Sequence, residues 1–310
     1  MHGTDSAADV QQCLVLNTLG AQRLDEEASC PQRPPTSNPF ELAGGETLVE
    51  DALDPLALAL AHGPNILPHV QSGQRAVCCL NPGRALHYTP AGLEPRTTAV
   101  ILDFGGVLGL PQDPVRAANM ASLCGRTMEE FSLLYQRDRL ELDRGTLSTE
   151  EYWARILRAS GVLPSSDMIA RIEEEDSLGW TRINERVVAW SRELRAAGYA
   201  TAILSNMPFD KLSYMRKNPA FDFIDEFPVT VFSCNHGLVK PEPAIYSFCL
   251  DLLRKRPDEC LFLDDSPVNV AGGLGVGIPT LLFRTADEAL PALAETWDLP
   301  VRALVDHHRV

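Results

Sequence analysis

The chain has 310 residues, a hydrophobic content of 45% and a formal net charge of −15. This length allows one large domain or a domain with a smaller companion, and the composition is that of a folded globular protein, which excludes wholesale disorder. The acidic balance argues against a surface that binds nucleic acid or anionic lipid.

The cysteines and the N-terminus bear on the cellular compartment. The 8 cysteines are scattered without a CxxC pair, and the first residues lack the basic and apolar segments of a secretory signal. The longest apolar stretch near the N-terminus, 56–61, is far shorter than the ~20 residues that span a bilayer. We therefore expect a cytoplasmic protein with reduced thiols and no membrane partner.

Residues 1–96 differ in composition from the rest of the chain. They hold 10 of the 23 prolines and no lysine, and proline-rich clusters such as 30–39 interrupt regular elements. We predict an N-terminal extension that is largely disordered, with one short helix at 46–62. A small partner-binding segment is the alternative interpretation.

Regular patterning begins at residue 97. Short apolar runs typical of buried parallel strands lie at 97–104, 199–206, 229–234, 260–265 and 279–283. Helical patterns at 183–198, 243–254 and 268–274 separate them. This alternation predicts an open α/β sheet with right-handed connections. The long helical stretch between the first two strands is then an insertion over the carboxyl edge of the sheet.

Polar residues follow several of these strands. In such sheets, ligands bind outside the carboxyl ends of the strands. The residues expected at that edge are Asp103, Ser205, Asn206, Lys240, Asp264 and Asp265. This set fits phosphoryl transfer through a covalent carboxylate, with Asp103 as the nucleophile. The two adjacent carboxylates would hold a divalent cation against it, and Lys240 would supply a fixed positive charge.

Four ordered segments carry a family resemblance. They are ILDFGGVL, ILSNMP, GLVKPEPAIY and CLFLDDSPVNVAGGLGVGIPTLLF. They resemble the four motifs of the haloacid dehalogenase (HAD) superfamily, and look most like its phosphatases with a helical cap. ELDRGTLSTEEYW and DFGGVL are similar to the N-terminal phosphatase domains of soluble epoxide hydrolases.

The resemblance implies a three-layer Rossmann-like core with a parallel sheet, plus an inserted helical cap. The core would comprise residues 97–111 and 183–310, and the cap residues 112–182. It further implies a Mg²⁺-dependent phosphatase that cleaves a small phosphorylated metabolite through an aspartyl-phosphate. We assign catalysis to Asp103 and Lys240. Phosphate binding is assigned to Ser205, Asn206 and Gly106, and Mg²⁺ binding to Asp103, the Gly105 carbonyl, Asp264 and Asp265.

One position departs from the family pattern. Active phosphatases of this superfamily usually carry a second Asp two residues after the nucleophile, where this chain has Gly105. That Asp protonates the leaving group and then activates water, which is typically worth about 10²–10⁴-fold in rate. Loss of this acid would slow the enzyme, but some members of the family with Gly at this position resemble functional sugar-phosphate phosphatases, so Gly105 does not imply inactivity. Asp113, near the cap hinge, is the alternative acid.

Other interpretations remain open at this stage. A catalytically weak or inactive HAD-fold binding or regulatory protein is one, and a haloacid dehalogenase is another. We interpret the glycines at 272–277 as close packing of a helix on the sheet rather than a dinucleotide site. Arg137, Arg139 and Arg144 of the predicted cap are interpreted as a solvated helix face, with a substrate contact as the alternative. The sequence does not indicate the oligomeric state.

Overall fold

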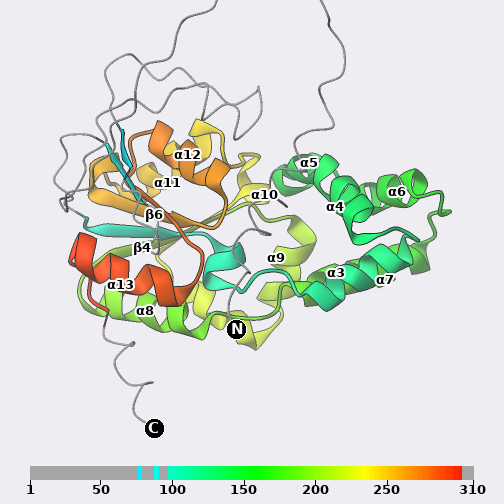
Figure 1. Cartoon of the computed structure of the whole chain (residues 1–310), viewed down its shortest axis with the longest axis horizontal. Coiled ribbons are helices and arrows are strands. Elements are labelled where there is room, and N and C mark those ends of the chain that lie inside the picture. The colour runs from blue at the N-terminus through cyan, green and yellow to red at the C-terminus, as the bar shows by residue number, and fades with distance from the viewer. Residues whose placement is uncertain (1–75, 79–86, 91–96, 302–310) are drawn as a thin grey trace, which may run out of the picture. The chain divides into compact units, whose positions relative to one another are not determined.

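The computed structural model describes residues 76–78, 87–90 and 97–301 (Figure 1). Five parallel strands form the centre of the sheet: β3 (Ala99–Leu102), β4 (Ala200–Ser205), β5 (Val229–Phe232), β6 (Cys260–Asp264) and β7 (Thr280–Leu282). The spatial order β7-β6-β3-β4-β5 places β3 between β4 and β6. Each strand is short, apolar and buried, as the sequence predicts for a parallel sheet covered on both faces.

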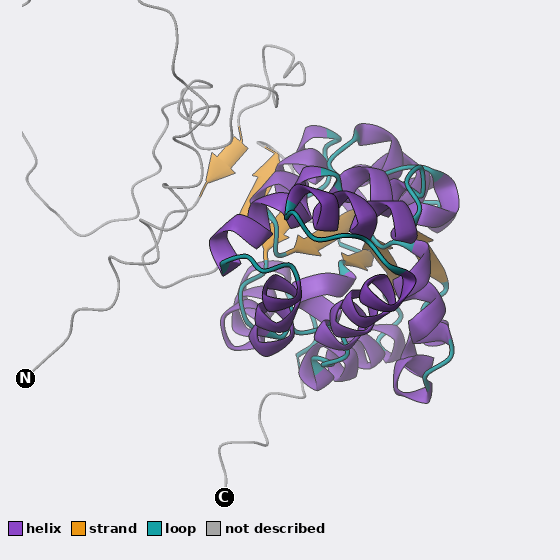
Figure 2. Ribbon diagram, turned by 90° about the vertical axis from the view of Figure 1, so that its right-hand side faces the viewer, coloured by secondary structure: helices purple, strands orange, loops and turns teal. Residues whose placement is uncertain are grey.

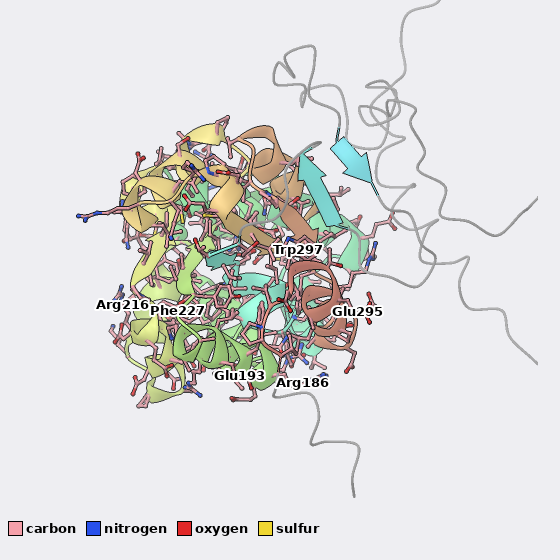
Figure 3. All side chains as sticks on the ribbon, turned by 90° about the vertical axis from the view of Figure 1, so that its left-hand side faces the viewer. Arg186, Glu193, Arg216, Phe227, Glu295 and Trp297 are labelled. Carbon is pink, nitrogen blue, oxygen red and sulfur yellow. The ribbon has the colours of Figure 1, made fainter. Side chains whose placement is uncertain are left out.

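Helices cover both faces of the sheet, with α8 (Glu185–Ala196) and α13 (Ala286–Trp297) on one and α11 (Pro243–Leu253) and α12 (Pro267–Gly275) on the other (Figures 1 and 2). Successive strand residues point to opposite faces, so Val100 and Leu102 join the cluster under α8, whereas Ala99 and Ile101 pack with α11. In Figure 3, the labelled residues Arg186 of α8 and Glu295 of α13 lie on the side of the molecule that carries these two helices. The fold is the predicted three-layer α/β core.

Two glycines let α12 pack closely, Gly273 against the sheet and Gly272 against α11 and the loop before it. A Cβ on Gly272 would lie 2.7 Å from the Tyr246 hydroxyl and 2.8 Å from the Pro241 carbonyl oxygen. A Cβ on Gly273 would lie 2.9 Å from the Phe262 ring. The predicted packing of helix on sheet is therefore confirmed at Gly273, whereas Gly272 meets α11 and a Cβ on Gly275 would meet no atom within 4 Å.

Short elements complete the core. They are η1 (Phe104–Leu108), α9 (Phe209–Arg216), η2 (Pro219–Glu226), α10 (Ser233–His236) and η3 (Pro257–Glu259). The strand predicted at 229–234 ends two residues early, because the chain turns into α10 at Ser233. Ser233 is fully buried there, and its hydroxyl oxygen accepts a hydrogen bond from the Met207 amide (2.8 Å).

A second group of helices lies between β3 and β4 in the chain: α3 (Pro114–Leu123), α4 (Met128–Arg137), α5 (Arg139–Arg144), α6 (Thr149–Ala159) and α7 (Ser166–Gly179). They share their own apolar cluster, which includes Met120, Phe131, Trp153 and Ile172. We call this group the helical insertion. In the described part of the chain, no helix is both long and apolar enough to cross a membrane.

Two chain segments connect the helical insertion to the core. They run side by side, with a bridge between Gly109 and Ile183. The Leu110 amide donates to the Arg182 carbonyl (2.8 Å), and the Asn184 amide donates to the Leu108 carbonyl (2.9 Å). The insertion therefore leaves and rejoins the core at one place, directly after η1.

Two further strands precede the core. β1 (Ala76–Cys78) pairs antiparallel with β2 (His87–Pro90), and β2 pairs antiparallel with β7. These strands lie within the segment that the sequence predicts to be largely disordered. The sequence does not reveal them because strands of three and four residues are too short to give a periodic pattern. The predicted helix at 46–62 lies outside the described residues. Pairing with β2 covers what would otherwise be an open edge at β7.

This pairing generates a prediction for two truncations. Deleting residues 1–90 removes β1 and β2, whereas deleting residues 1–75 keeps both. The longer deletion should lower Tm relative to the shorter one by roughly 2–10 °C, because the loss of a few ladder hydrogen bonds costs about 1–3 kcal/mol. Equal Tm values, measured by differential scanning calorimetry, would show that the β2–β7 pairing contributes nothing to stability.

Candidate active site

Three strand ends bring the predicted site residues to one edge of the sheet. Asp103 follows β3, Ser205 ends β4 and Asp264 ends β6. The registers pair Leu102 with Ile203 and with Leu263, so Asp103 is level with Asp264 and Ser205 lies one residue further along β4. The convergence expected from the sequence is thus present in the structure.

Lys240 lies at the centre of this edge and is 1% exposed. Its ammonium lies 2.9 Å from Asp103 Oδ1 and donates to Asp264 Oδ2 at 2.6 Å. A third hydrogen bond goes to the Leu204 carbonyl oxygen (2.9 Å). An ammonium has three N–H donors, so all three are used within the site.

The ion pairs decide the charge state of this lysine. Burial alone would lower the pKa of Lys240, but the carboxylates of Asp103 and Asp264 outweigh it and raise the pKa above its ordinary value. Lys240 is therefore a permanent positive charge in this site rather than a proton donor.

Asn206 fixes the backbone of Lys240. Its side-chain amide donates to the Lys240 carbonyl (2.9 Å), and its side-chain oxygen accepts from the Lys240 amide (2.8 Å). The Asn206 side chain, which we predicted to contact phosphate, thus has a positioning task in this structure. Ser205 is buried beside it at the end of β4. The phosphate roles of Ser205, Asn206 and Gly106 remain predictions.

Three carboxylates meet at the same edge. One oxygen each of Asp103, Asp264 and Asp265 lies within 4.8 Å of the others. Asp264 is fully buried. Its Oδ1, the oxygen that does not accept from Lys240, accepts hydrogen bonds from the Ser266 amide (2.8 Å) and from the Asn269 side chain (3.0 Å). When all three carboxyls are ionised and Lys240 is protonated, the cluster has a net charge of about −2, which one divalent cation would balance.

The crowding shifts the acidities of the two C-terminal carboxyls. Desolvation by the surrounding protein, and then the charge of Asp103, raise the pKa of Asp265 to about 6. Burial raises the pKa of Asp264, Lys240 opposes this, and Asp103 adds to it, with a net upward shift. Both shifts follow mainly from burial, and the nearby charge of Asp103 adds to them.

The donor set fits Mg²⁺. This ion takes oxygen ligands, commonly one or two carboxylates with water completing an octahedron. Asp265 is the side chain open to solvent, whereas both oxygens of Asp264 already accept hydrogen bonds. The structure therefore favours Asp103 and Asp265 as the residues that would contact a cation, with Asp264 orienting Lys240.

Gly106 is a glycine for two physical reasons. Its φ is +70°, a left-handed conformation that L side chains rarely adopt. A Cβ there would also lie 2.1 Å from Asp265 Oδ2. Gly105 is different, because its angles (φ −63°, ψ 132°) suit any residue and a Cβ would meet the Trp180 ring at 3.3 Å.

Asp113, the alternative acid, is engaged elsewhere. Its carboxylate caps α3 by accepting a hydrogen bond from the Val115 amide (2.8 Å), and it lies 3.9 Å from Arg182. These contacts give it a local structural role at the start of the helical insertion.

The arginines of the helical insertion are not all solvated, which corrects our interpretation of them. The Arg139 side chain is only 13% exposed, because it packs over the Tyr135 ring and pairs with Asp143 at 3.0 Å. Arg144 donates two hydrogen bonds to Glu242 of the core, at 2.5 and 2.9 Å. The pair of Arg139 with Asp143 has the i,i+4 spacing of a helix, so periodicity allows it. The pair of Arg144 with Glu242 joins residues distant in sequence, so periodicity could not show it.

Sequence reasoning also missed several residues around the site. Asn269 orients Asp264, and the Ser233 hydroxyl donates to the Asp143 carbonyl of the insertion (2.5 Å). Asn269 carries a weak signal, since it lies in the first turn of the helix that follows the Asp pair. Lys211, buried against Asp176 at 3.1 Å, is one of only four lysines in the chain, which is a signal in itself.

Comparison with known proteins gives a consistent family. The family model for haloacid dehalogenase-like hydrolases matches residues 97–277. Bifunctional epoxide hydrolase 2 of Sus scrofa is 31% identical over 153 residues, which cover 46% of this chain and 26% of that protein. The chain therefore spans about a quarter of the length of this relative.

Two other proteins match along most of their own length. Sesquiterpene phosphatase astK of Aspergillus oryzae is 24% identical over 182 residues, covering 58% of this chain and 86% of that protein. A HAD family enzyme from Bacteroides thetaiotaomicron, solved with magnesium and inorganic phosphate, superposes with a TM-score of 0.50 at 24% identity. It covers 59% of this chain and 92% of its own, and the likeness shows a common fold.

The two adjacent glycines of η1 offer a matched test of the site geometry. Gly106→Ala should lower Tm by roughly 2–10 °C, since left-handed strain and the clash with Asp265 cost about 1–3 kcal/mol. Gly105→Ala should change Tm by less than half as much, because its backbone is unstrained. Thermal unfolding of both variants gives the comparison, and a larger effect at Gly105 would contradict the geometry described.

Proposed function

The chain belongs to the haloacid dehalogenase-like hydrolase family, and on that premise we propose that it is a Mg²⁺-dependent phosphatase acting through an aspartyl-phosphate on Asp103. The substrate is a small phosphorylated metabolite. The observation that carries the proposal is the placement of Asp103 against Lys240 with two further carboxylates beside it. A phosphatase relative and a magnesium-bearing structural neighbour support it.

Asp103 has the geometry of a nucleophile. Its Oδ1 accepts the Phe104 amide (2.6 Å) and faces Lys240 Nζ (2.9 Å). Within the described residues, no hydrogen bond is found on Oδ2, which leaves that oxygen for attack. Two contacts on one oxygen fix the carboxylate, so little reorganisation is needed before the reaction.

The reaction proceeds in two displacements. Asp103 Oδ2 forms a bond to phosphorus as the bond from phosphorus to the leaving-group oxygen breaks, and the leaving group departs with that electron pair. Water then forms a bond to the phosphorus of the aspartyl-phosphate as the bond from phosphorus to Asp103 Oδ2 breaks, and the carboxylate leaves with that electron pair. The proton lost by the water passes to the released inorganic phosphate or to solvent. Lys240 balances the negative charge that gathers at this edge in both steps.

A bound cation would neutralise the negative charge that Lys240 alone does not balance. Asp103 and Asp265 would hold Mg²⁺ together with the Gly105 carbonyl, and the bound ion would polarise the phosphoryl oxygens. The excess negative charge of the carboxylate cluster supports a metal-dependent phosphatase over a dehalogenase, whose carbon-centred displacement needs no cation.

Replacing the nucleophile tests the proposal. Asp103→Asn should reduce Mg²⁺-dependent release of phosphate from 4-nitrophenyl phosphate by more than about 10³-fold, because an amide does not attack phosphorus. Asp251→Asn, on the exposed side of α11, is the matched control and should keep wild-type turnover. Activity of Asp103→Asn within twofold of wild type would eliminate the mechanism. Folded wild-type protein without activity would favour a binding or regulatory role.

Cation binding should depend on pH in a defined direction. The pKa of Asp265 is raised to about 6 in the folded, metal-free chain, above the ~3.9 of an unfolded Asp. The folded state therefore holds more protons between these values, and the stability contributed by this carboxyl falls as pH rises from about 4 to 6. Mg²⁺ binds the deprotonated form and should offset that loss.

The measurement is the rise in Tm caused by Mg²⁺ at pH 5.0 and at pH 7.5. The rise should be larger at pH 7.5, reaching roughly 5–10 °C at about 100 times Kd. Asp265→Asn should remove most of the difference between the two pH values. An equal Mg²⁺ effect at both pH values in wild type would show that Asp265 is not a ligand.

A further inference from the structure

Trp180 stands at the junction between the helical insertion and the core. It follows the last turn of α7, and its amide donates to the Ser177 carbonyl (3.3 Å). Three residues later the chain reaches Ile183, which bridges to Gly109 behind η1. The indole is therefore carried by the segment that returns to the nucleophile loop.

The indole ring fills the space in front of Gly105. A Cβ on Gly105 would lie 3.3 Å from Trp180 Cζ3 and 3.9 Å from both Cε3 and Cη2. These three atoms form the outer edge of the six-membered ring, so this edge offers carbon and no hydrogen-bonding group. Hydrocarbon occupies the place where a side chain at position 105 would project.

A buried ion pair lies over the face of the ring. The Lys211 ammonium lies 4.9 Å from the centre of the Trp180 ring and 3.1 Å from Asp176 Oδ2. Lys211 and Asp176 are 4% and 2% exposed. Asp176 also accepts hydrogen bonds from the Tyr135 hydroxyl (2.8 Å) and from Gln112 (3.1 Å). A cation held over an aromatic face in a desolvated site attracts that face, so Lys211 positions the indole.

We propose that Trp180 is a specificity-determining residue. It fills the space where a general acid would lie, and so restricts the site to substrates whose leaving groups depart as stable anions without protonation. This inference rests on the proposed phosphatase function. The bond from phosphorus to the leaving oxygen breaks with its electron pair going to that oxygen, and the indole edge supplies no proton. The favoured class is therefore aryl, enol and acyl phosphates, whose leaving groups are stable as anions. Lys211 is a positioning residue that acts through the ring.

Gly105 and Trp180 form a complementary pair in this account. The backbone of Gly105 tolerates any L-residue, and the three heavy atoms nearest to a Cβ there all belong to the indole. An acid at position 105 should consequently act only when residue 180 is smaller. This dependence of position 105 on position 180 distinguishes the proposed role of Trp180 from a site that merely lacks an acid at position 105.

The experiment is a double-mutant cycle of wild type, Gly105→Asp, Trp180→Ala and the double variant. Each is assayed with 4-nitrophenyl phosphate and with propyl phosphate, whose leaving group needs a proton. Gly105→Asp alone should raise kcat/KM for the alkyl ester by less than about 3-fold, and the double variant by at least about 10-fold, toward the range of general acid catalysis. On the aryl ester, the double variant should gain less than about 3-fold, because that leaving group hardly needs a proton.

A second readout does not depend on activity. Gly105→Asp should lower Tm in the chain that keeps Trp180. In the Trp180→Ala chain it should lower Tm by less than half as much, because the aspartate no longer collides with the indole. Trp180→Leu provides a second smaller side chain if Trp180→Ala folds poorly. Equal Tm effects in both backgrounds would show that the indole does not fill the space at position 105.

Lys211→Met tests the positioning role. In the wild-type background it should raise KM for the aryl ester by about 3–10-fold with kcat within about twofold, since the cation–π attraction that orders the ring is lost. In the Trp180→Ala background the same change should alter KM by less than twofold. A merely structural role would give equal effects in both backgrounds.

The outcomes distinguish the two proposals. If the proposed phosphatase mechanism is wrong, Asp103→Asn will leave the turnover of the aryl ester unchanged. The Tm values of the four variants then still decide whether the indole occupies the space at position 105. The specificity inference is overturned if Gly105→Asp alone gives the full gain on the alkyl ester, or if a folded, aryl-active double variant gains nothing.

Discussion

The ammonium of Lys240 is the interaction on which the rest of the site depends. A buried charge persists in a protein only when it is paired and hydrogen-bonded, and this lysine has three partners from three strand ends: Asp103, Asp264 and the Leu204 carbonyl. Removing the lysine would leave buried carboxylates facing each other without a counter-charge. The same contacts fix the Asp103 carboxylate, so the parallel sheet, the buried charge and the reactive oxygen form one arrangement.

The helical insertion is tied to the loops that carry this arrangement. Arg144 pairs with Glu242, two residues beyond Lys240, and also donates to the Gly237 carbonyl (3.2 Å). The Ser233 hydroxyl joins the loop after β4 to the Asp143 carbonyl. With the buried pair of Lys211 and Asp176, these contacts connect α5 and α7 to the ends of β4 and β5. A substitution in the helical insertion is therefore expected to affect the reacting groups through only a few intervening side-chain contacts.

The sequence is informative where the physical requirement is local. Apolar runs predict the five parallel strands, and the acids that follow them predict where Asp103 and Asp264 meet, because parallel strands deliver their ends to one edge. The left-handed Gly106 and the two-way bonding of Asn206 to Lys240 depend on loop geometry that no spacing encodes. The burial of Arg139 and the position of Trp180 depend on how the insertion packs against the core. Such tertiary contacts between segments distant in sequence leave no periodic signal.

The central claim is that Asp103 becomes phosphorylated during turnover, and chemical trapping tests it most directly. The protein is mixed with Mg²⁺ and an excess of 4-nitrophenyl phosphate, quenched in acid within the first turnovers, digested and mapped by mass spectrometry. The account predicts one phosphoryl group on the peptide that contains Asp103, removed by hydroxylamine as an acyl phosphate should be, and absent from Asp103→Asn. Release of product with no adduct on Asp103, or with the adduct on another residue, would contradict the account.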